Sequence, residues 1–250
     1  MTRCRTKTDP PYLAYAAPVG TQTPADAGTT PAVDGRSTRW DEHRRARRHT
    51  IVTAAVTAIE RYGPDALTAQ IAELAGLPRT HVYRHFDDKQ ALDLAVSSHI
   101  GAQIGERIRV ALAGRGSVRA IVSASIDEHL SWIEAHPNLY RFLAQHAYAV
   151  RLSGSSDAVD AKAAFAAELT GLIRRYLAVL GADTSPAERI IVGLVGLVDA
   201  TAAWWLETGE PPRAVLTAEL TDRVWVILDR SARELGLDLD LDQPLPRLAP

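Results

Sequence analysis

A short run of basic, aromatic and hydroxyl residues lies between Pro78 and Phe86, in the order Arg79-Thr80-His81-Val82-Tyr83-Arg84-His85. Val82 and Phe86 are four residues apart, so on a helix they share one face and the polar residues take the opposite one. Arginine can hydrogen-bond both acceptors of a guanine, threonine and tyrosine can contact a thymine methyl or a phosphate, and histidine can donate to a phosphate. We therefore predict a short exposed helix that enters the major groove of DNA.

The residues before this segment predict the helix and turn that would position it. Thr68 is a candidate N-cap for a first helix, whose buried face carries Ile71 and Ala75. Gly76 can adopt the left-handed conformation that ends such a helix. Pro78 can open the second helix, because its missing N–H costs nothing in a first turn. The alternative is that these are merely two packed helices with a polar face.

Another helix is expected to start directly after this pair. Asp87 and Gln90 have the spacing of a capping box. Lys89 falls in the first turn of that helix, where its charge and the helix amides could together hold a phosphate.

Four arginines crowd the start of the helix predicted over residues 40–62, namely Arg44, Arg45, Arg47 and Arg48. Positive charge at a helix N-terminus is unfavourable unless an anion offsets it. We predict phosphate contacts by Arg45 and Arg48, the alternative being a solvated charged turn. Arg36 and Arg39 are expected to precede this helix, where a basic arm could enter the minor groove or form an inert extension.

Metal and enzyme chemistry are not expected. His81 and His85 have metal-ligand spacing, but Val82 stands where an H-E-x-x-H motif requires glutamate, and no third ligand is evident. No nucleophile elbow, phosphate-binding loop, dinucleotide fingerprint or cysteine–histidine pair is found. The prediction is a protein that is not an enzyme and has no cofactor.

Composition describes an ordinary globular protein of 250 residues, 46% hydrophobic and 23% charged. The single cysteine, Cys4, excludes an internal disulfide, so a reducing cytoplasm is the expected location. The formal net charge of −2 conceals a basic segment over residues 36–89 and an acidic remainder. The apolar stretch 190–203 falls short of the roughly 20 residues that a membrane span needs, so no membrane association is expected.

From Arg39 onward the hydrophobic residues recur with a helical period and show no strand-like alternation, which predicts an all-α fold of about nine helices. We expect a disordered arm over 1–38, a helix-turn-helix domain over 39–92, a ligand-binding and dimerisation domain over 93–236, and a flexible acidic, proline-rich tail over 237–250. Helices of the second domain are predicted over 88–112, 117–135, 138–150, 157–181, 186–208 and 212–235.

The stretch 186–208 is apolar on nearly every face, which is typical of a helix buried all round. Gly193 and Gly196 lower its helix propensity and would permit close approach of another helix. With Trp225, Val226 and Leu228 of 212–235 it could supply the apolar surface of a two-fold dimer. An intramolecular core is the alternative.

A hydrophobic small molecule is the expected ligand of the second domain, because its predicted helices are rich in large apolar residues. A carboxylate such as Asp199 on an apolar helix is costly to bury unless it is paired, so it could bind a cation or a ligand hydroxyl, or face water. For each aromatic candidate, core packing is the alternative. The candidate pocket residues are Ile126, His129, Ile133, Tyr140, Leu143, Phe165, Leu169, Asp199 and Trp205.

Residues 44–92 resemble the DNA-binding domain of the TetR family of bacterial transcriptional regulators. The resemblance rests on Tyr62-Gly63, on Thr68…Ile71-Ala72…Ala75-Gly76-Leu77, on Val82-Tyr83-Arg84-His85-Phe86 and on Lys89…Leu92. It implies that Arg79, Thr80, Tyr83 and Arg84 read bases and that Thr68, His81, His85 and Lys89 contact phosphates. Pro78 departs from the family pattern, which usually has a capping serine there.

The resemblance also implies a two-domain fold of nine helices that dimerises through its last two. The expected function is that of a homodimeric repressor, paired through 186–208 and 212–235, which a hydrophobic small molecule releases from a palindromic double-stranded operator. The Trp204-Trp205 pair is similar to actinobacterial members that sense acyl-CoA or other hydrophobic molecules. The alternative is a DNA-binding dimer without small-molecule control.

Overall fold

The computed structural model describes residues 35–153 and 161–238, together with 240 and 243. Most of the predicted arm and most of the predicted tail therefore lie outside the described residues. The described residues form nine helices and no strands, which confirms the expected all-α fold. The helices are α1 (Gly35–Tyr62), α2 (Thr68–Leu74), α3 (Arg79–Val82), α4 (Lys89–Leu112), α5 (Val118–Ala135), α6 (Pro137–Ser153), α7 (Ala161–Val179), α8 (Ala187–Thr208) and α9 (Arg213–Glu234).

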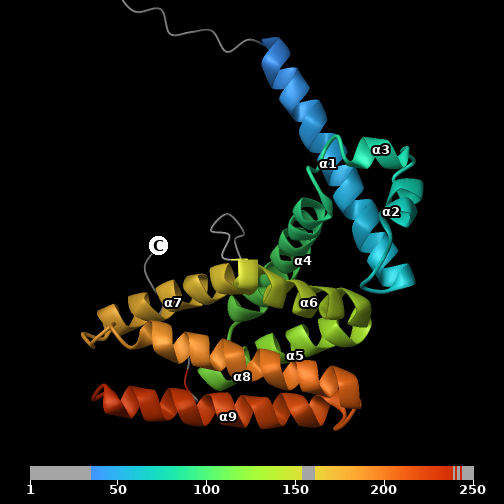
Figure 1. Ribbon diagram of the computed structural model, residues 1–250. Coiled ribbons are helices and arrows are strands. Elements are labelled where there is room, and N and C mark those ends of the chain that lie inside the picture. Colours follow the sequence, from blue (N-terminus) through green and yellow to red (C-terminus); the bar gives the residue numbers. More distant parts are fainter. Residues whose placement is uncertain (1–34, 154–160, 239, 241–242, 244–250) are drawn as a thin grey trace, which may run out of the picture.

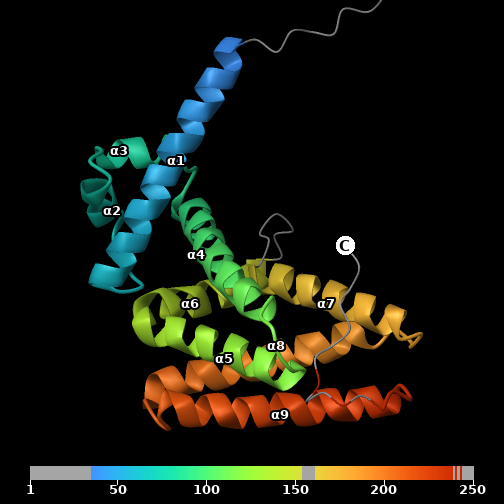
Figure 2. The same cartoon turned by 180° about the vertical axis from the view of Figure 1, so that it is seen from behind.

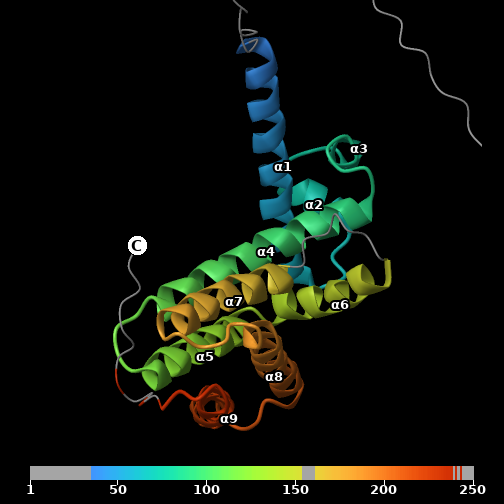
Figure 3. The same ribbon diagram turned by 90° about the vertical axis from the view of Figure 1, so that its left-hand side faces the viewer.

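The first three helices form a head, and α5 to α9 form a separate body (Figure 1). Helix α1 is a long rod, with α2 and α3 beside it on one side. Helix α4 leaves the head and runs into the body, where it packs on α5, α6 and α7 (Figure 2). Helices α8 and α9 lie on the side of the body farthest from the head (Figure 3). Helix α4 therefore contributes to both parts, and α1 of the head also packs against α6 of the body.

The core of the head follows directly from helical periodicity. Ile51, Ala55 and Ala58 share one face of α1 and are fully buried. They belong to the same packed cluster as Ile71 of α2 and Val82 of α3. Burying this apolar surface is what holds the two short helices against α1, since helices of this length are not stable alone.

Gly76 makes the turn between α2 and α3, as predicted. Its φ is +64°, in the left-handed region that favours glycine. The Gly76 N–H donates to the Glu73 carbonyl at 3.0 Å and the Leu77 N–H donates to the Ala72 carbonyl at 2.9 Å. This pair of bonds is a Schellman motif, and it fixes where α2 ends.

Three helix starts differ from the predictions. Thr68 is the first residue of α2, and Leu67 takes the N-cap position. The Leu67 N–H donates to Gln70 Oε1 at 2.7 Å. Asp88, not Asp87, caps α4 by accepting from the Ala91 N–H at 2.7 Å. Helix α1 begins at Gly35, so Arg36 and Arg39 belong to its first turns and do not precede it. The helices of the body begin and end within a few residues of their predicted limits.

Helix α8 is less enclosed than predicted. It spans 22 residues and contains an 18-residue window with a mean hydropathy of 1.6, so by length and composition alone it could cross a membrane. Within one chain it packs against α5, α7 and α9, yet Val192 and Trp204 remain 56% and 55% exposed. A Cβ added at Gly193 or Gly196 would meet nothing within 4 Å. The expected close approach at these glycines therefore does not come from within the described chain.

Replacing Gly76 by alanine should lower the free energy of unfolding by about 1–2 kcal/mol, because an L-residue is strained in the left-handed region. Gly171 is the matched control, since it lies inside α7 with open space around it. Gly171→Ala should be neutral or stabilising, by up to about 1 kcal/mol. Urea denaturation of both variants measures the difference, and equal effects would contradict the role of Gly76.

Candidate nucleic-acid interface and internal cavity

The polar face predicted for the short helix α3 is on the outside of the molecule. Val82 and Phe86 are 0% and 1% exposed, so they anchor the segment to the core. The helix is shorter than predicted, because it ends at Val82. The outer side of the segment presents Arg79 and Thr80 of α3, and Tyr83 and Arg84 of the turn that follows, to solvent. Helix α3 lies at the outer edge of the head, with the body on the other side of α4 (Figure 1). The geometry leaves this face free to meet a large partner.

Thr68 lies behind that face and not on it. Its side chain is buried, and its Oγ1 accepts a hydrogen bond from the Tyr83 hydroxyl at 3.3 Å. The bond links α2 to the segment that follows α3. A phosphate contact by Thr68 stays a prediction.

The four arginines of α1 divide into two kinds. Arg44, Arg45 and Arg47 are exposed, whereas Arg48 is partly buried. The Arg48 guanidinium donates to the His85 carbonyl and lies 4.1 Å from the centre of the Phe86 ring. Arg48 therefore ties α1 to the residues that follow α3, a structural role that the sequence did not predict.

The same cluster depresses the basicity of His85. Burial is the largest cause of its lowered pKa, and the charges of Arg44, Arg48 and Arg47 add to it. Positive charges gathered around His85 disfavour a further proton there, and a bound anion would reduce this repulsion. His81 is half-buried beside this cluster, so both histidines lie where a phosphate contact is expected.

A polar chain crosses from the head to the body at the start of α4. Lys89, in the first turn, forms an ion pair with Asp93, which is only 7% exposed. The other Asp93 oxygen lies 3.3 Å from His146 Nε2 of α6. His146 Nδ1 is 2.9 Å from the Phe142 carbonyl, so both ring nitrogens face acceptors and the imidazolium satisfies both.

These contacts set the charge states of the pair. The hydrogen bond to Asp93 is the main reason that the pKa of His146 is raised above its ordinary value, and burial opposes it. Burial alone would raise the pKa of Asp93, but the hydrogen bonds from His146 and Lys89 outweigh it and lower that pKa. From the sequence, only the Lys89–Asp93 contact could have been predicted, because these two residues have the i,i+4 spacing of an ion pair on a helix.

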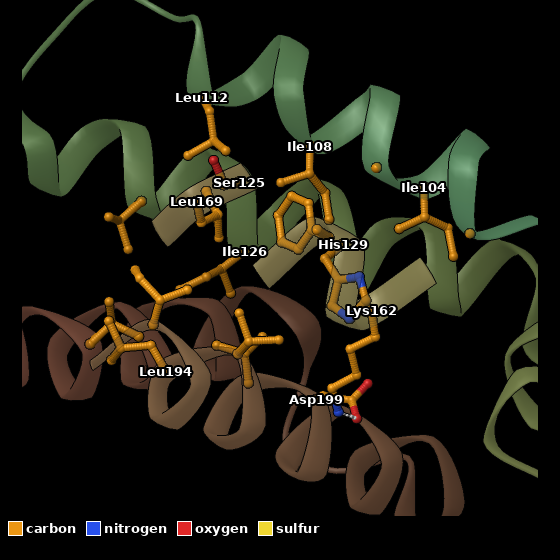
Figure 4. A pocket seen from close by; sticks show the side chains of 18 of the residues that line it. Ile104, Ile108, Leu112, Ser125, Ile126, His129, Lys162, Leu169, Leu194 and Asp199 are labelled. Carbon is orange, nitrogen blue, oxygen red and sulfur yellow. Dashed lines mark hydrogen bonds and ion pairs between the residues drawn. The ribbon is translucent and has the colours of Figure 1, made fainter. Parts of the chain in front are cut away.

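The body encloses a cavity of about 570 Å³, which residues of α4 to α9 line (Figure 4). Its wall is mostly aliphatic. Seven of the predicted pocket residues line it, namely Ile126, His129, Tyr140, Leu143, Phe165, Leu169 and Asp199. Ile133 and Trp205 do not. Ile133 is fully buried in the core, and the Trp205 indole donates to the Pro211 carbonyl at 2.7 Å.

Sequence reasoning missed much of the lining, and two parts of it matter most here. One is the wall from α4, with Ile104, Ile108 and Leu112, which follows the four-residue spacing that begins at Ile100. The other is Lys162 of α7, whose ammonium pairs with Asp199. The four-residue periodicity could have indicated the first, but nothing local in the sequence indicates the second.

Asp199 is the centre of a polar cluster at one end of the cavity. The Tyr140 hydroxyl donates to Asp199 Oδ1 at 3.0 Å, and Lys162 pairs with the other oxygen. Burial, with the charge and hydrogen bond of Asp199 adding to it, raises the pKa of Tyr140 far above its usual range. Asp199 is thus paired, as the cost of burying a lone carboxylate requires.

The two parts of the chain match the models of two known protein families. The model of bacterial regulatory proteins of the tetR family matches residues 51–96, and the model of the tetracyclin repressor-like C-terminal domain matches residues 107–237. The molecule is a DNA-binding transcriptional regulator. It belongs to the TetR family, as the sequence of its head already suggested.

Relatives support this assignment. The HTH-type transcriptional regulator Rv0472c of Mycobacterium tuberculosis is 28% identical over 200 residues, which are 80% of this chain and 84% of that protein. The HTH-type transcriptional activator FasR of Mycolicibacterium smegmatis is 26% identical over 64% of this chain and 72% of its own.

Solved structures share the fold. A tetR-family regulator from Streptomyces coelicolor superposes with a TM-score of 0.61 at 22% identity, over 77% of this chain and 86% of that one. FadR from Bacillus subtilis, solved in complex with stearoyl-CoA, gives 0.50 at 19% identity, over 70% of this chain and 96% of that one.

Arg45 and Arg48 provide a matched pair for separating DNA contact from folding. Arg45→Ala should leave stability unchanged and reduce the slope of log affinity against log salt by about 0.9, because one phosphate contact is lost. Arg48→Ala should lower the free energy of unfolding by about 1–3 kcal/mol, because it removes a charge-assisted hydrogen bond and a cation–π contact. DNA titrations at several salt concentrations measure the slope, and urea denaturation measures the free energy of unfolding. If Arg45→Ala were destabilised and Arg48→Ala were not, the roles assigned to the two arginines would be wrong.

The raised pKa of His146 makes a pH-dependent contribution to stability. Because the folded protein holds this proton more tightly than the unfolded chain, the contribution is full below the ordinary pKa of 6.5 and is lost as pH rises through the folded value. The stability difference between the wild type and His146→Gln should therefore grow as pH falls from about 8 to about 6. Denaturation of both proteins across this range tests it, and a constant difference would contradict the His146–Asp93 contact.

Proposed function

We propose that this protein is a homodimeric regulator that leaves a palindromic operator when a hydrophobic small molecule enters the cavity of its body. The observation that carries the proposal is the course of α4. Its first turn holds Lys89 in the head, and its later turns supply Ile104 and Ile108 to the cavity wall. A ligand that displaces this wall acts on the same helix that carries the head.

The DNA contacts are assigned by exposure and charge. Arg79, Thr80, Tyr83 and Arg84 read base edges in the major groove. Phosphates are contacted by Arg45, His81, His85 and Lys89. Phosphate contacts are also assigned to Arg48 by its charge and to Thr68 by the family resemblance alone, since both side chains hold the recognition segment from behind. Two copies of α3 about 34 Å apart would match half-sites one helical turn apart.

The dimer is assigned to α8 and α9. Their outer faces expose apolar side chains that a soluble monomer would normally bury, including Val192, Trp204, Val215 and Val226. The open space at Gly193 lets a second backbone approach closely. A two-fold arrangement would set these surfaces against their own copies.

The effector is assigned to the aliphatic cavity. Its volume of about 570 Å³ lies within the range of small-molecule sites. FadR of Bacillus subtilis was solved with stearoyl-CoA, and AlkX of a Dietzia strain, with a TM-score of 0.53, is implicated in biodegradation of n-alkanes. These two proteins favour a lipid-like molecule here as well, as does the aliphatic wall.

Coupling between cavity and operator runs through Lys89, Asp93 and His146. His146 lines the cavity and shares Asp93 with Lys89, the predicted phosphate contact. A ligand that shifts α6 against α4 would break or remake these bonds. A differential affinity of about 1–3 kcal/mol between the two conformers is enough for release.

The second candidate is a DNA-binding dimer without small-molecule control. The cavity argues against it, because a large void with buried, unpartnered polar atoms is costly to maintain without a ligand. The division into a helix-turn-helix domain over 39–92 and a ligand-binding and dimerisation domain over 93–236, the cytoplasmic location and the lack of enzymatic activity belong to the same proposal.

Arg84→Ala should weaken binding to a duplex selected from a random pool by about 1–3 kcal/mol and relax the preference for one base pair in each half-site. Arg45→Ala is the control, since a lost phosphate contact weakens binding to all sequences alike. Titration of the selected and a scrambled duplex at one salt concentration measures both effects. Unchanged affinity of Arg84→Ala would remove the base-reading role.

Val226→Asp should convert the dimer to a monomer, because it places a charge in the apolar contact on α9. Val110 is a matched control, since it is 67% exposed on α4 while Val226 is 63% exposed on α9. Val110→Asp should stay dimeric. Sedimentation equilibrium distinguishes the two, and a dimeric Val226→Asp would place the interface elsewhere.

A further inference from the structure

One end of the cavity differs chemically from the rest. Lys162 and Asp199 lie together there with the ring of His129 nearby, while Leu112 and Leu169 lie away from them (Figure 4). Tyr140 completes this group through its bond to Asp199. We call Lys162, Asp199, His129 and Tyr140 the polar end of the cavity. The remaining wall is largely aliphatic, so a ligand that fills the space has an apolar body and one polar terminus.

The charges at the polar end cancel. The Lys162 ammonium and the Asp199 carboxylate form an ion pair. Burial is the main cause of the lowered pKa of His129, which favours the neutral ring, and Tyr140 is un-ionised because its pKa is raised. His146, which also lines the cavity, shares Asp93 with Lys89 and does not belong to this end. A charged head group bound at the polar end would therefore bring a net charge among groups whose own charges already cancel.

Hydrogen-bonding capacity is nevertheless unused in the lining. His129 Nδ1 is buried and has no hydrogen-bond partner in the described part of the protein, and the same holds for Ser97 Oγ. Both residues line the cavity. A neutral imidazole has one donor and one acceptor nitrogen, and a hydroxyl can do either. Buried polar groups of this kind are normally satisfied by a partner, here one that enters the cavity.

We propose that the effector ends in an uncharged group that both donates and accepts a hydrogen bond, an alcohol or a primary amide, and that this group binds at the polar end beside His129. The inference rests on the proposed function, since it assigns the chemistry of the same cavity. It excludes a free carboxylate and an ammonium group as the buried terminus of the effector.

Four ten-carbon probes with the same chain test the inference: 1-decanol, decanoate, decylammonium and decane. Calorimetric titration of the full-length protein at pH 7, below micellar concentrations, should show saturable binding of 1-decanol. Its affinity should exceed those of the other three by about tenfold or more, the factor that corresponds to roughly 1.4 kcal/mol. Tighter binding of either ionic probe, or equal binding of decane, would overturn the inference.

Charge-altering variants sharpen the test. Asp199→Asn shifts the charge of the polar end by one positive unit, so decanoate should gain at least tenfold relative to 1-decanol. Lys162→Met shifts it by one negative unit, so decylammonium should gain instead. An unchanged order of affinities in both variants would show that the polar end does not bind the head group.

His129→Phe removes the unpartnered nitrogen while keeping an aromatic ring. It should raise the melting temperature of the ligand-free protein and abolish the preference for 1-decanol over decane. His99→Phe is the control, because His99 is also partly buried but lies outside the cavity lining. It should keep the wild-type preference, and a retained preference in His129→Phe would contradict the inference.

The outcomes separate this inference from the proposed function. If an ionic probe binds most tightly and still weakens operator binding, the effector site stands and the assigned head group is wrong. If no probe binds while operator binding persists, both the effector site and the head group are wrong and the dimer without small-molecule control is favoured.

Discussion

The structure depends on one helix that belongs to both halves of the molecule. Helix α4 begins at the cap made by Asp88, directly after the recognition segment, and ends 24 residues later at the far side of the cavity. Val96 and Ile100 are fully buried along it, so it is packed as a rigid element between the two halves. Close packing transmits a displacement and does not absorb it. The proposed regulation uses this path, since a change in what the cavity contains would reach the head through α4.

Charge organises the head as strongly as packing does. Burial lowers the pKa of His85, and the charges of Arg44, Arg48 and Arg47 add to this effect. Arg48 is also held by the His85 carbonyl and the Phe86 ring. The repulsion among these groups is a cost in the free protein that a phosphate backbone would remove. The head is thus suited to an anionic partner before any base is read. The acidic body does not share this property.

Much of this architecture was predictable because it depends on local signals. Helical periodicity located the nine helices, and Gly76 marked the turn because only a residue tolerant of positive φ can end a helix in this way. The buried pair Val82 and Phe86 showed which face of α3 is exposed. Helix caps were misplaced by one residue, since neighbouring Asp87 and Asp88 offer the same chemistry and only geometry decides between them.

The remainder depends on contacts between distant residues. Lys162 pairs with Asp199 across 37 positions, and His146 meets Asp93 across 53, so neither partner can be read from spacing. Nothing in the sequence distinguishes Arg48 from the neighbouring arginines. Its structural role arises because the residues after α3 pack beside it. Ile133 and Trp205 were expected in the cavity because of their type, but the rotation of their helices turns them elsewhere. The presence of a helix can be predicted from neighbouring residues, whereas the residues that line a cavity depend on how distant helices pack.

The affinity of the wild-type protein for its selected operator, measured at one salt concentration with and without saturating 1-decanol, tests the coupling between cavity and DNA most directly. A weakening of about 5- to 150-fold, the range that corresponds to a coupling of 1–3 kcal/mol, is the predicted result. An operator affinity that stays the same while calorimetry shows the cavity to be filled would contradict the account.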